Sequence, residues 1–225
     1  MLMFYFSVSM RFSSILIFSL LGLIVHGQSQ LAILTTDPPK SKKRFEYQLE
    51  RMDKRVNSPF HEGAPLISTD GSILYFFVAD HPDNKFGTKG SQDIWYSERT
   101  SDGKWRDAVH MPAPLNQNRY NQVMSIINEG NTLLIRGKTK SSEGFSITHR
   151  NFNGWSDPVP LMIRDYDHMR KGVYSGGILN HQGDVLLMYL NELKDEKISD
   201  LYAIFKQADG TWSKPKYIEA LNTSY

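Results

Sequence analysis

The pattern of hydrophobic and polar positions divides the chain into three stretches. An apolar run extends from about residue 15 to residue 25, and a mostly polar stretch follows it to about residue 55. Beyond residue 60, short runs rich in Val, Ile, Leu, Tyr and Phe alternate with polar turns, and helical periodicity is weak. Such runs with partial alternation are typical of β-strands. The sequence therefore predicts an all-β fold for most of the chain.

The strand-like runs recur three times in the same order. Each copy has a glycine turn, a run, a variable loop, a second run and a tight turn that ends in tryptophan. The three tryptophans, at 105, 155 and 212, are 50 and 57 residues apart. Glycine supplies the positive φ that tight hairpins require. We expect the recurring positions to be structural: Asp70, Gly71, Trp105, Gly130, Trp155, Gly183 and Trp212.

Four antiparallel strands in a repeat of this length are typical of a β-propeller blade. The predicted blades span about 60–111, 119–162 and 172–219, and each tryptophan begins the outer strand of its blade. Three unrelated hairpins of a β-sandwich are the alternative. Because a closed propeller needs at least four blades, the ring is expected to be incomplete. We therefore expect the N-terminal part of a longer protein, or a truncated reading frame.

A second motif marks the links between blades, and it appears at 56–60, 115–120 and 221–225. The copy expected at 163–172 has lost the pattern. The repeats thus occupy residues 56–225, and residues 28–55 form an N-terminal linker or a closing strand. Two interpretations of residues 43–57 stay open: an outer strand that completes a ring, and a short amphipathic helix with Phe45, Leu49 and Met52 on one face.

Residues 1–27 have the features of a secretory signal peptide. Arg11 precedes an apolar run of about 11 residues, which is within the usual range for a signal peptide and short for a membrane span. Val25 and Gly27 are small enough for the cleavage site, so we expect cleavage before Gln28. An uncleaved anchor is the alternative. The chain has no cysteine, which excludes disulfides, thiolate metal ligands and a lipid-modified N-terminus.

Neither the net charge nor the spacing of the histidines indicates nucleic-acid or metal binding. The formal net charge is +2, from 26 basic and 24 acidic residues spread along the chain, so we expect no nucleic-acid partner. The basic residues of 40–44 are interpreted as a solvated linker, with a polyanion contact as the alternative. The seven histidines lack zinc-site spacing, and no phosphate-binding loop is present, so neither a metal nor a cofactor is expected.

The first predicted blade carries a family resemblance. Its "EGAPLISTDGSILYFFVADHPDN" and "GSQDIWYSERTSDGKW" segments resemble the WD-like, TolB-type propeller repeats of exported envelope proteins, above all those placed ahead of an OmpA-like domain. The second blade departs from the pattern, with Glu129 in the turn and Ser146 where the first has Trp95. The resemblance implies a periplasmic or outer-membrane-associated protein with a binding or scaffold role, and only indirect membrane association. No OmpA-like domain is present, so peptidoglycan binding is not assigned to this chain.

The sequence favours binding over catalysis. A glycoside-cleaving, sialidase-like propeller is the enzymatic alternative, but Asp102 and Asp209 match ordinary turn formers and no two carboxylates stand out. Loops on a rigid scaffold are where recognition residues usually lie, although the same loops are also consistent with plain solvated connections. The partner is expected to be an envelope protein or cell-wall component. The candidate partner-binding residues are His81, Asn84, Lys85, Arg119, Tyr120, Asp167 and Arg170.

Overall fold

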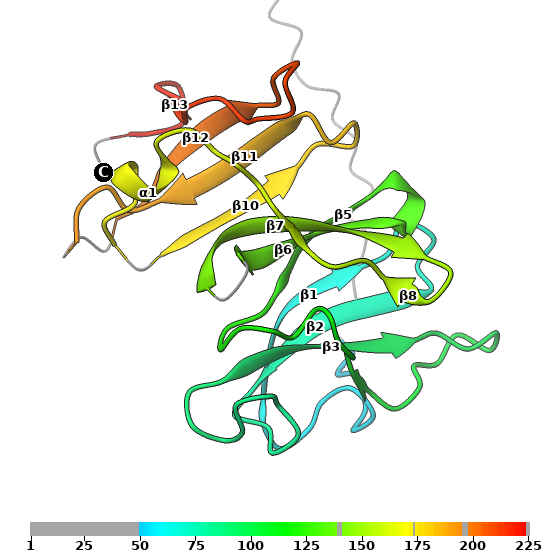
Figure 1. The fold of residues 1–225 in the computed structure, drawn as a ribbon. Coiled ribbons are helices and arrows are strands. Elements are labelled where there is room, and N and C mark those ends of the chain that lie inside the picture. Colours follow the sequence, from blue (N-terminus) through cyan, green and yellow to red (C-terminus); the bar gives the residue numbers. More distant parts are fainter. Residues whose placement is uncertain (1–49, 139–140, 173, 195–197, 224–225) are drawn as a thin grey trace, which may run out of the picture. The chain divides into compact units, whose positions relative to one another are not determined.

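A computed structural model describes residues 50–138, 141–172, 174–194 and 198–223, and these form three antiparallel sheets (Figure 1). The first sheet contains β1 (His61–Ile67), β2 (Ile73–Ala79), β3 (Gln92–Glu98) and β4 (Val109–His110). The second contains β5 (Val123–Ile127), β6 (Thr132–Lys138), β7 (Ser141–Asn151), β8 (Gly154–Trp155) and β9 (Val159–Pro160). The third contains β10 (Ser175–Leu179), β11 (Val185–Leu190), β12 (Asp200–Phe205) and β13 (Lys216–Tyr217).

Strand order confirms the all-β prediction and the three antiparallel units. In the first and third sheets, neighbouring strands are consecutive in sequence, and the second has an extra short strand because β8 and β9 both pair with β7. Helix is confined to a 3-10 turn at Asn128–Gly130 and the single turn α1 (Tyr166–Met169) among the described residues. Helix α1 lies within 163–172, where the link motif is lost from the sequence.

Both turns of each unit have the geometry that the repeat requires. The hairpin between β1 and β2 closes at Gly71, whose φ is 72°, and the turn before Trp212 closes at Gly210, whose φ is 82°. Each tryptophan then pairs with a basic residue at the end of the third strand of its sheet or directly after it. The pairs are Arg99 with Trp105, Arg150 with Trp155, and Lys206 with Trp212.

The hydrophobic core consists of three clusters. One lies between the first and second sheets and includes Tyr75 and Ile94 from one side and Leu133 and Ile135 from the other. Another joins the second sheet to the third and includes Leu134, Phe145, Leu186, Met188 and Trp212. The last covers the remaining face of the first sheet, where Val56 packs against Leu74, Phe76 and Trp95.

The segment before β1 adopts neither of the forms expected for residues 43–57 in the part that is described. Residues 50–60 contain turns and bends without a strand or helix, and Met52, Val56 and Phe60 pack onto the first sheet. The predicted signal peptide at 1–27 and the remainder up to residue 49 lie outside the described residues.

The link motif has a structural explanation in two of its copies. Asn116 accepts a hydrogen bond from the Ile94 amide at 2.8 Å and donates one to the Ile94 carbonyl at 3.0 Å. Asn222 does the same with Leu201, at 2.8 and 2.9 Å. One asparagine side chain therefore ties the link to the third strand of its own sheet, as a further strand would.

Candidate functional site

A pocket of about 390 Å³ is lined by more arginine than any other residue type. We call it the cationic pocket, and its lining residues are Arg119, Tyr120, Arg136, Ser141, Glu143, Arg170 and Ser175. Its lining thus contains three guanidinium groups and one carboxylate. Three of the predicted partner-binding residues line this pocket: Arg119 and Tyr120 from one link, and Arg170 from the next.

Arg170 is the arginine that forms an ion pair with the carboxylate of the pocket. It follows α1, and its Nη1 donates to the Gly172 carbonyl at 2.7 Å, while Nη2 lies 2.5 Å from the Glu143 carboxylate. Its side chain is 14 % exposed, and its buried Nε has no hydrogen-bond partner. A buried N–H without a partner costs free energy, so a ligand atom that accepts from Nε would gain a strong, charge-assisted bond.

Ser175, which lines the pocket, is bonded to Tyr166 of α1, the helical turn that precedes Arg170. The Tyr166 hydroxyl donates to the Ser175 Oγ at 3.1 Å, and both side chains are buried. Burial raises the pKa of Tyr166, and this rise is opposed by the Ser175 hydrogen bond and by the charges of Arg170 and Arg136. The tyrosine is therefore a neutral hydrogen-bonding group, and both arginine charges act on the same small region.

Arg119 and Tyr120 form the exposed side of the pocket. Arg119 donates from Nη1 to the carbonyls of Lys89 and Gly90, at 2.7 and 3.3 Å, and its guanidinium lies 5.3 Å from the Phe86 ring centroid. These contacts hold the guanidinium in place while its side chain stays exposed. A fixed guanidinium loses less entropy when it binds a planar anion.

Arg136 was not among the residues selected from the sequence. It lies in the interior of β6, six positions after the hairpin glycine Gly130, where the first and third units have Phe77 and Tyr189. The sequence signal for Arg136 was therefore a charged residue at a position that is aromatic in the other two copies of the repeat. The sequence alone does not show that β6 places this residue beside Arg119 and Arg170.

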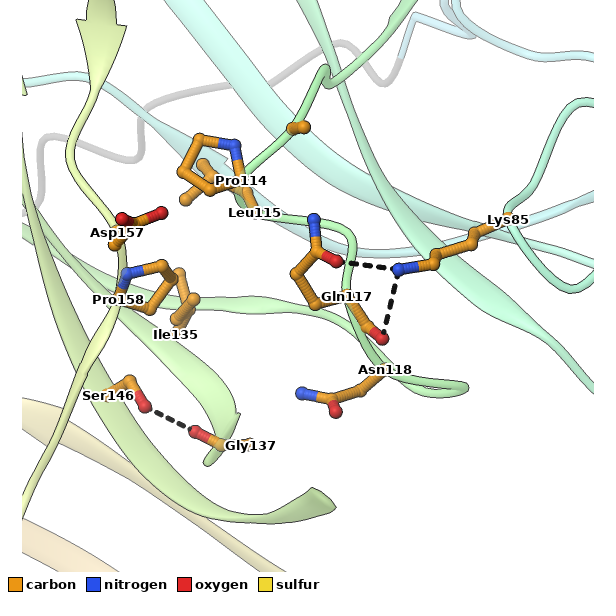
Figure 2. A pocket seen from close by; sticks show the side chains of 11 residues that line it. Lys85, Pro114, Leu115, Gln117, Asn118, Ile135, Gly137, Ser146, Asp157 and Pro158 are labelled. Carbon is orange, nitrogen blue, oxygen red and sulfur yellow. Dashed lines mark hydrogen bonds between the residues drawn. The ribbon is translucent and has the colours of Figure 1, made fainter. Parts of the chain in front are cut away.

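A larger cavity of about 800 Å³ lies next to Lys85 and is shown in Figure 2. The Lys85 ammonium donates to the Gln117 side chain at 2.6 Å and lies 3.4 Å from the Gln117 carbonyl. Asp157 and Pro158 lie on the other side, and Leu115 and Ile135 contribute apolar surface. With one cation and one carboxylate in its lining, this cavity favours neither anions nor cations, in contrast to the cationic pocket.

The remaining predicted residues lie apart from the cationic pocket. Asn84 is buried, donates to the Val78 carbonyl and the Ser91 hydroxyl, and accepts from the Trp95 ring nitrogen, so its amide holds the loop together. His81 packs its ring against Trp95, with centroids 4.4 Å apart. Asp167 is exposed and lines a third pocket, near Arg164 and Asp209.

A buried carboxylate at Asp93 organises the loops around Lys85. It accepts from the Lys85 amide at 2.7 Å and from the Asn121 side chain at 2.8 Å, and it contacts the His110 ring nitrogen at 2.8 Å. Asp93 thus connects the β2–β3 loop, the link and β4 in one network. It was not predicted to be a site residue, and its partners give it a structural role.

The turn aspartates behave as the sequence suggested. Asp209 accepts hydrogen bonds from the Thr211 hydroxyl and amide, at 2.6 and 2.9 Å, and these bonds lower its pKa. Hydrogen bonds from Thr100 and Lys104 lower the pKa of Asp102. Within the described ranges, no group of His, Cys, Asp and Glu side chains is arranged to hold a metal ion, and no helix is long and apolar enough to cross a membrane.

Comparisons with known proteins identify no family. No protein-family profile and no curated protein sequence matches the chain. Among solved structures, the chain is similar to the Hadza microbial sialidase Hz136, with 14 % sequence identity and a TM-score of 0.38. The match covers 68 % of this chain and 37 % of the sialidase chain. A likeness this distant carries no argument about activity.

Proposed function

We propose that this protein is a non-catalytic binding module that captures an anionic ligand in the cationic pocket. The observation that carries the proposal is the convergence of Arg119, Arg136 and Arg170 on one pocket with a single opposing carboxylate, Glu143. Arginine binds carboxylates and phosphates through paired, charge-assisted hydrogen bonds. The partnerless Nε of Arg170 adds a buried donor to this set.

The scaffold is proposed to be a partial β-propeller of the TolB-type class, and the three sheets to be its blades. Support comes from the repeated unit, the consecutive strand order and the short fourth strand of each sheet. The expected signal peptide and the resemblance to envelope repeats together favour a periplasmic role, with an acidic cell-wall component as the ligand. Mass spectrometry of the mature protein tests the export part, and a chain that still begins at Met1 or Met10 contradicts it.

A binding role explains the pocket better than glycoside cleavage does. Glycoside hydrolysis usually employs two positioned carboxylates, and Glu143 is the only one in the lining of this pocket, where it is paired with Arg170. Hydrolysis of a glycan panel that is lost in a Glu143→Gln variant would replace the proposal with an enzymatic one.

Calorimetric titration with four probes tests the proposal. A muropeptide with free carboxylates and glucuronate are expected to bind, glucose is not, and inorganic phosphate distinguishes carboxylate from general anion recognition. Arg119→Gln removes an exposed cation and is expected to weaken binding by about tenfold, in line with the worth of a charge-assisted hydrogen bond. Binding should also weaken with added salt.

Arg106→Gln is the matched control, because Arg106 is an exposed arginine in the segment before β4, outside this pocket. It should leave the affinity unchanged. Equal affinities for wild type and Arg119→Gln, or equal binding of glucose, would contradict the proposal.

A further inference from the structure

One face of the third sheet is apolar, and none of the residues that the structure describes covers it. We call it the open face, and it consists of Ile178, Leu187, Tyr189, Leu201 and Phe205, all of which are exposed. Ile178 pairs with Leu187, and Tyr189 pairs with Leu201, so these side chains project from the same side of the sheet. The opposite face carries Leu186, Met188 and Leu190, which are buried against the second sheet.

The residues equivalent to Leu187 and Leu201 are buried in the other two sheets. Tyr75, Leu134 and Leu187 each lie four residues after the hairpin glycine of their own sheet. Tyr75 and Leu134 are 2 % and 0 % exposed, whereas Leu187 is 44 % exposed. In the third strand, the strand pairings make Ile94, Phe145 and Leu201 equivalent. Ile94 and Phe145 are fully buried, and Leu201 is 37 % exposed.

The links show the same difference. Leu115 precedes Asn116, and Leu221 precedes Asn222, whose hydrogen bonds to the third strand match. Leu115 is buried between the first and second sheets. Leu221 is 60 % exposed. The third unit thus keeps the side chains of a sheet-to-sheet contact although no described residue covers them.

The two contacts within the chain indicate what covers such a face. Tyr75 and Ile94 pack against Leu133 and Ile135, which are the third and fifth residues after the hairpin glycine Gly130. In the same way, Leu134 and Phe145 pack against Leu186 and Met188, the third and fifth residues after Gly183. Both contacts therefore join the same positions of consecutive repeats.

We propose that the open face binds a further antiparallel sheet of this same repeat, which presents aliphatic side chains at the third and fifth positions after its hairpin glycine. A second copy of the chain fits less well. Its corresponding side chains, Leu74 and Phe76 of the first sheet, are already covered by Val56. This inference is independent of anion binding in the cationic pocket.

The chain itself supplies the probe. Asn116 and Asn222 make equivalent hydrogen bonds. Residues 117–172 can therefore be joined directly after Asn222, and each added residue keeps its position in the repeat. This extended protein keeps residues 1–222 and adds a second copy of β5–β9, with the Leu133 and Ile135 side chains in position to pack on the open face. Size-exclusion chromatography with light scattering gives the mass of both forms.

Thiol labelling then reports whether the open face is covered. Leu187→Cys introduces the only cysteine of either form, since the chain has none. Labelling is expected to slow at least about tenfold in the extended protein, because a covered thiol reacts only through local opening. Val159→Cys, on an exposed edge position of the second sheet, is the control and should label equally in both forms.

The remaining outcomes overturn the proposal. Equal labelling of Leu187→Cys in the two forms, or aggregation of the extended protein, means that the added sheet does not bind the open face. If the Leu187→Cys thiol stays protected when Leu133→Asp is introduced in the added copy, the added sheet does not make the contact that joins consecutive repeats. If the original chain is a dimer in which Leu187→Cys is already protected and becomes reactive on dilution, a second copy covers the face instead.

Discussion

The first and third sheets share one repeat but differ in what surrounds them. Both have four consecutive antiparallel strands, a hairpin closed by glycine and an asparagine that bonds the third strand. The first sheet is covered on both faces, by Val56 on one side and by the second sheet on the other. Within the described part of the chain, the third sheet is covered on one face only. The repeat thus specifies hydrogen bonds and strand order, whereas burial depends on the neighbouring segment.

The tryptophans after the tight turns show the reverse difference in burial, because the one in the third unit is the more buried. Trp212 is buried, and its backbone is bonded on both sides, to the Met162 carbonyl at 3.0 Å and to the Arg164 amide at 3.2 Å. Trp105 is half-buried, and the Arg99 guanidinium lies 5.8 Å from its ring centroid. The segment before α1 covers Trp212, so the same sequence feature has different environments in the two units.

The largest expected effect therefore separates these two residues. Trp212→Ala removes a ring that is packed in the core and is expected to lower the free energy of unfolding by about 3–5 kcal/mol. Trp105→Ala removes a ring that already contacts solvent and is expected to cost less than about 2 kcal/mol. Urea unfolding followed by circular dichroism measures both. Equal costs would show that the turn, rather than the burial of the ring, determines the contribution.

A second pair of substitutions tests whether equivalent hydrogen bonds have equal worth. Asn116→Ala leaves the buried Ile94 amide and carbonyl without that partner and is expected to cost about 1–3 kcal/mol. Asn222→Ala exposes the corresponding Leu201 groups to water, so less than about 1 kcal/mol is expected. Urea unfolding gives both values, and faster hydrogen exchange at the Ile94 amide reports the local effect. A larger cost at Asn222 would contradict this account.

The sequence predicted what depends on neighbours along the chain. Hairpin glycines, strand segments and the link asparagines are local signals, and the three sheets formed where those signals placed them. It predicted the candidate site only in part, because Arg119, Arg136 and Arg170 meet through contacts between separate sheets and links. Asn84 illustrates the same limit: a polar loop residue resembles a recognition residue in sequence, yet its amide is buried in bonds to its own loop.

The smallest expected effect concerns the hairpins of the first and third sheets. In the first, Asp70 accepts hydrogen bonds from the Ser68 hydroxyl and from the amide and hydroxyl of Ser72, which lower its pKa to about 2. Gln182 occupies the corresponding position in the third, where the Asn180 side chain accepts from the Asp184 and Val185 amides. Of these two hairpins, only the first therefore depends on a carboxylate at this position.

Because the pKa of Asp70 is lower in the folded state, its contribution to stability is complete above the unfolded pKa of about 4 and disappears as the pH falls through about 2. Thermal unfolding of wild type and Asp70→Asn should thus differ most near neutral pH, and the difference in Tm should shrink between about pH 4 and pH 2. Gln182→Ala, at the corresponding position of the third sheet, is the matched control. Because the Gln182 side chain is uncharged, this substitution should shift Tm by the same amount at every pH. A difference for Asp70→Asn that stays constant, or grows as the pH falls, would show that the hairpin does not depend on the ionised carboxylate.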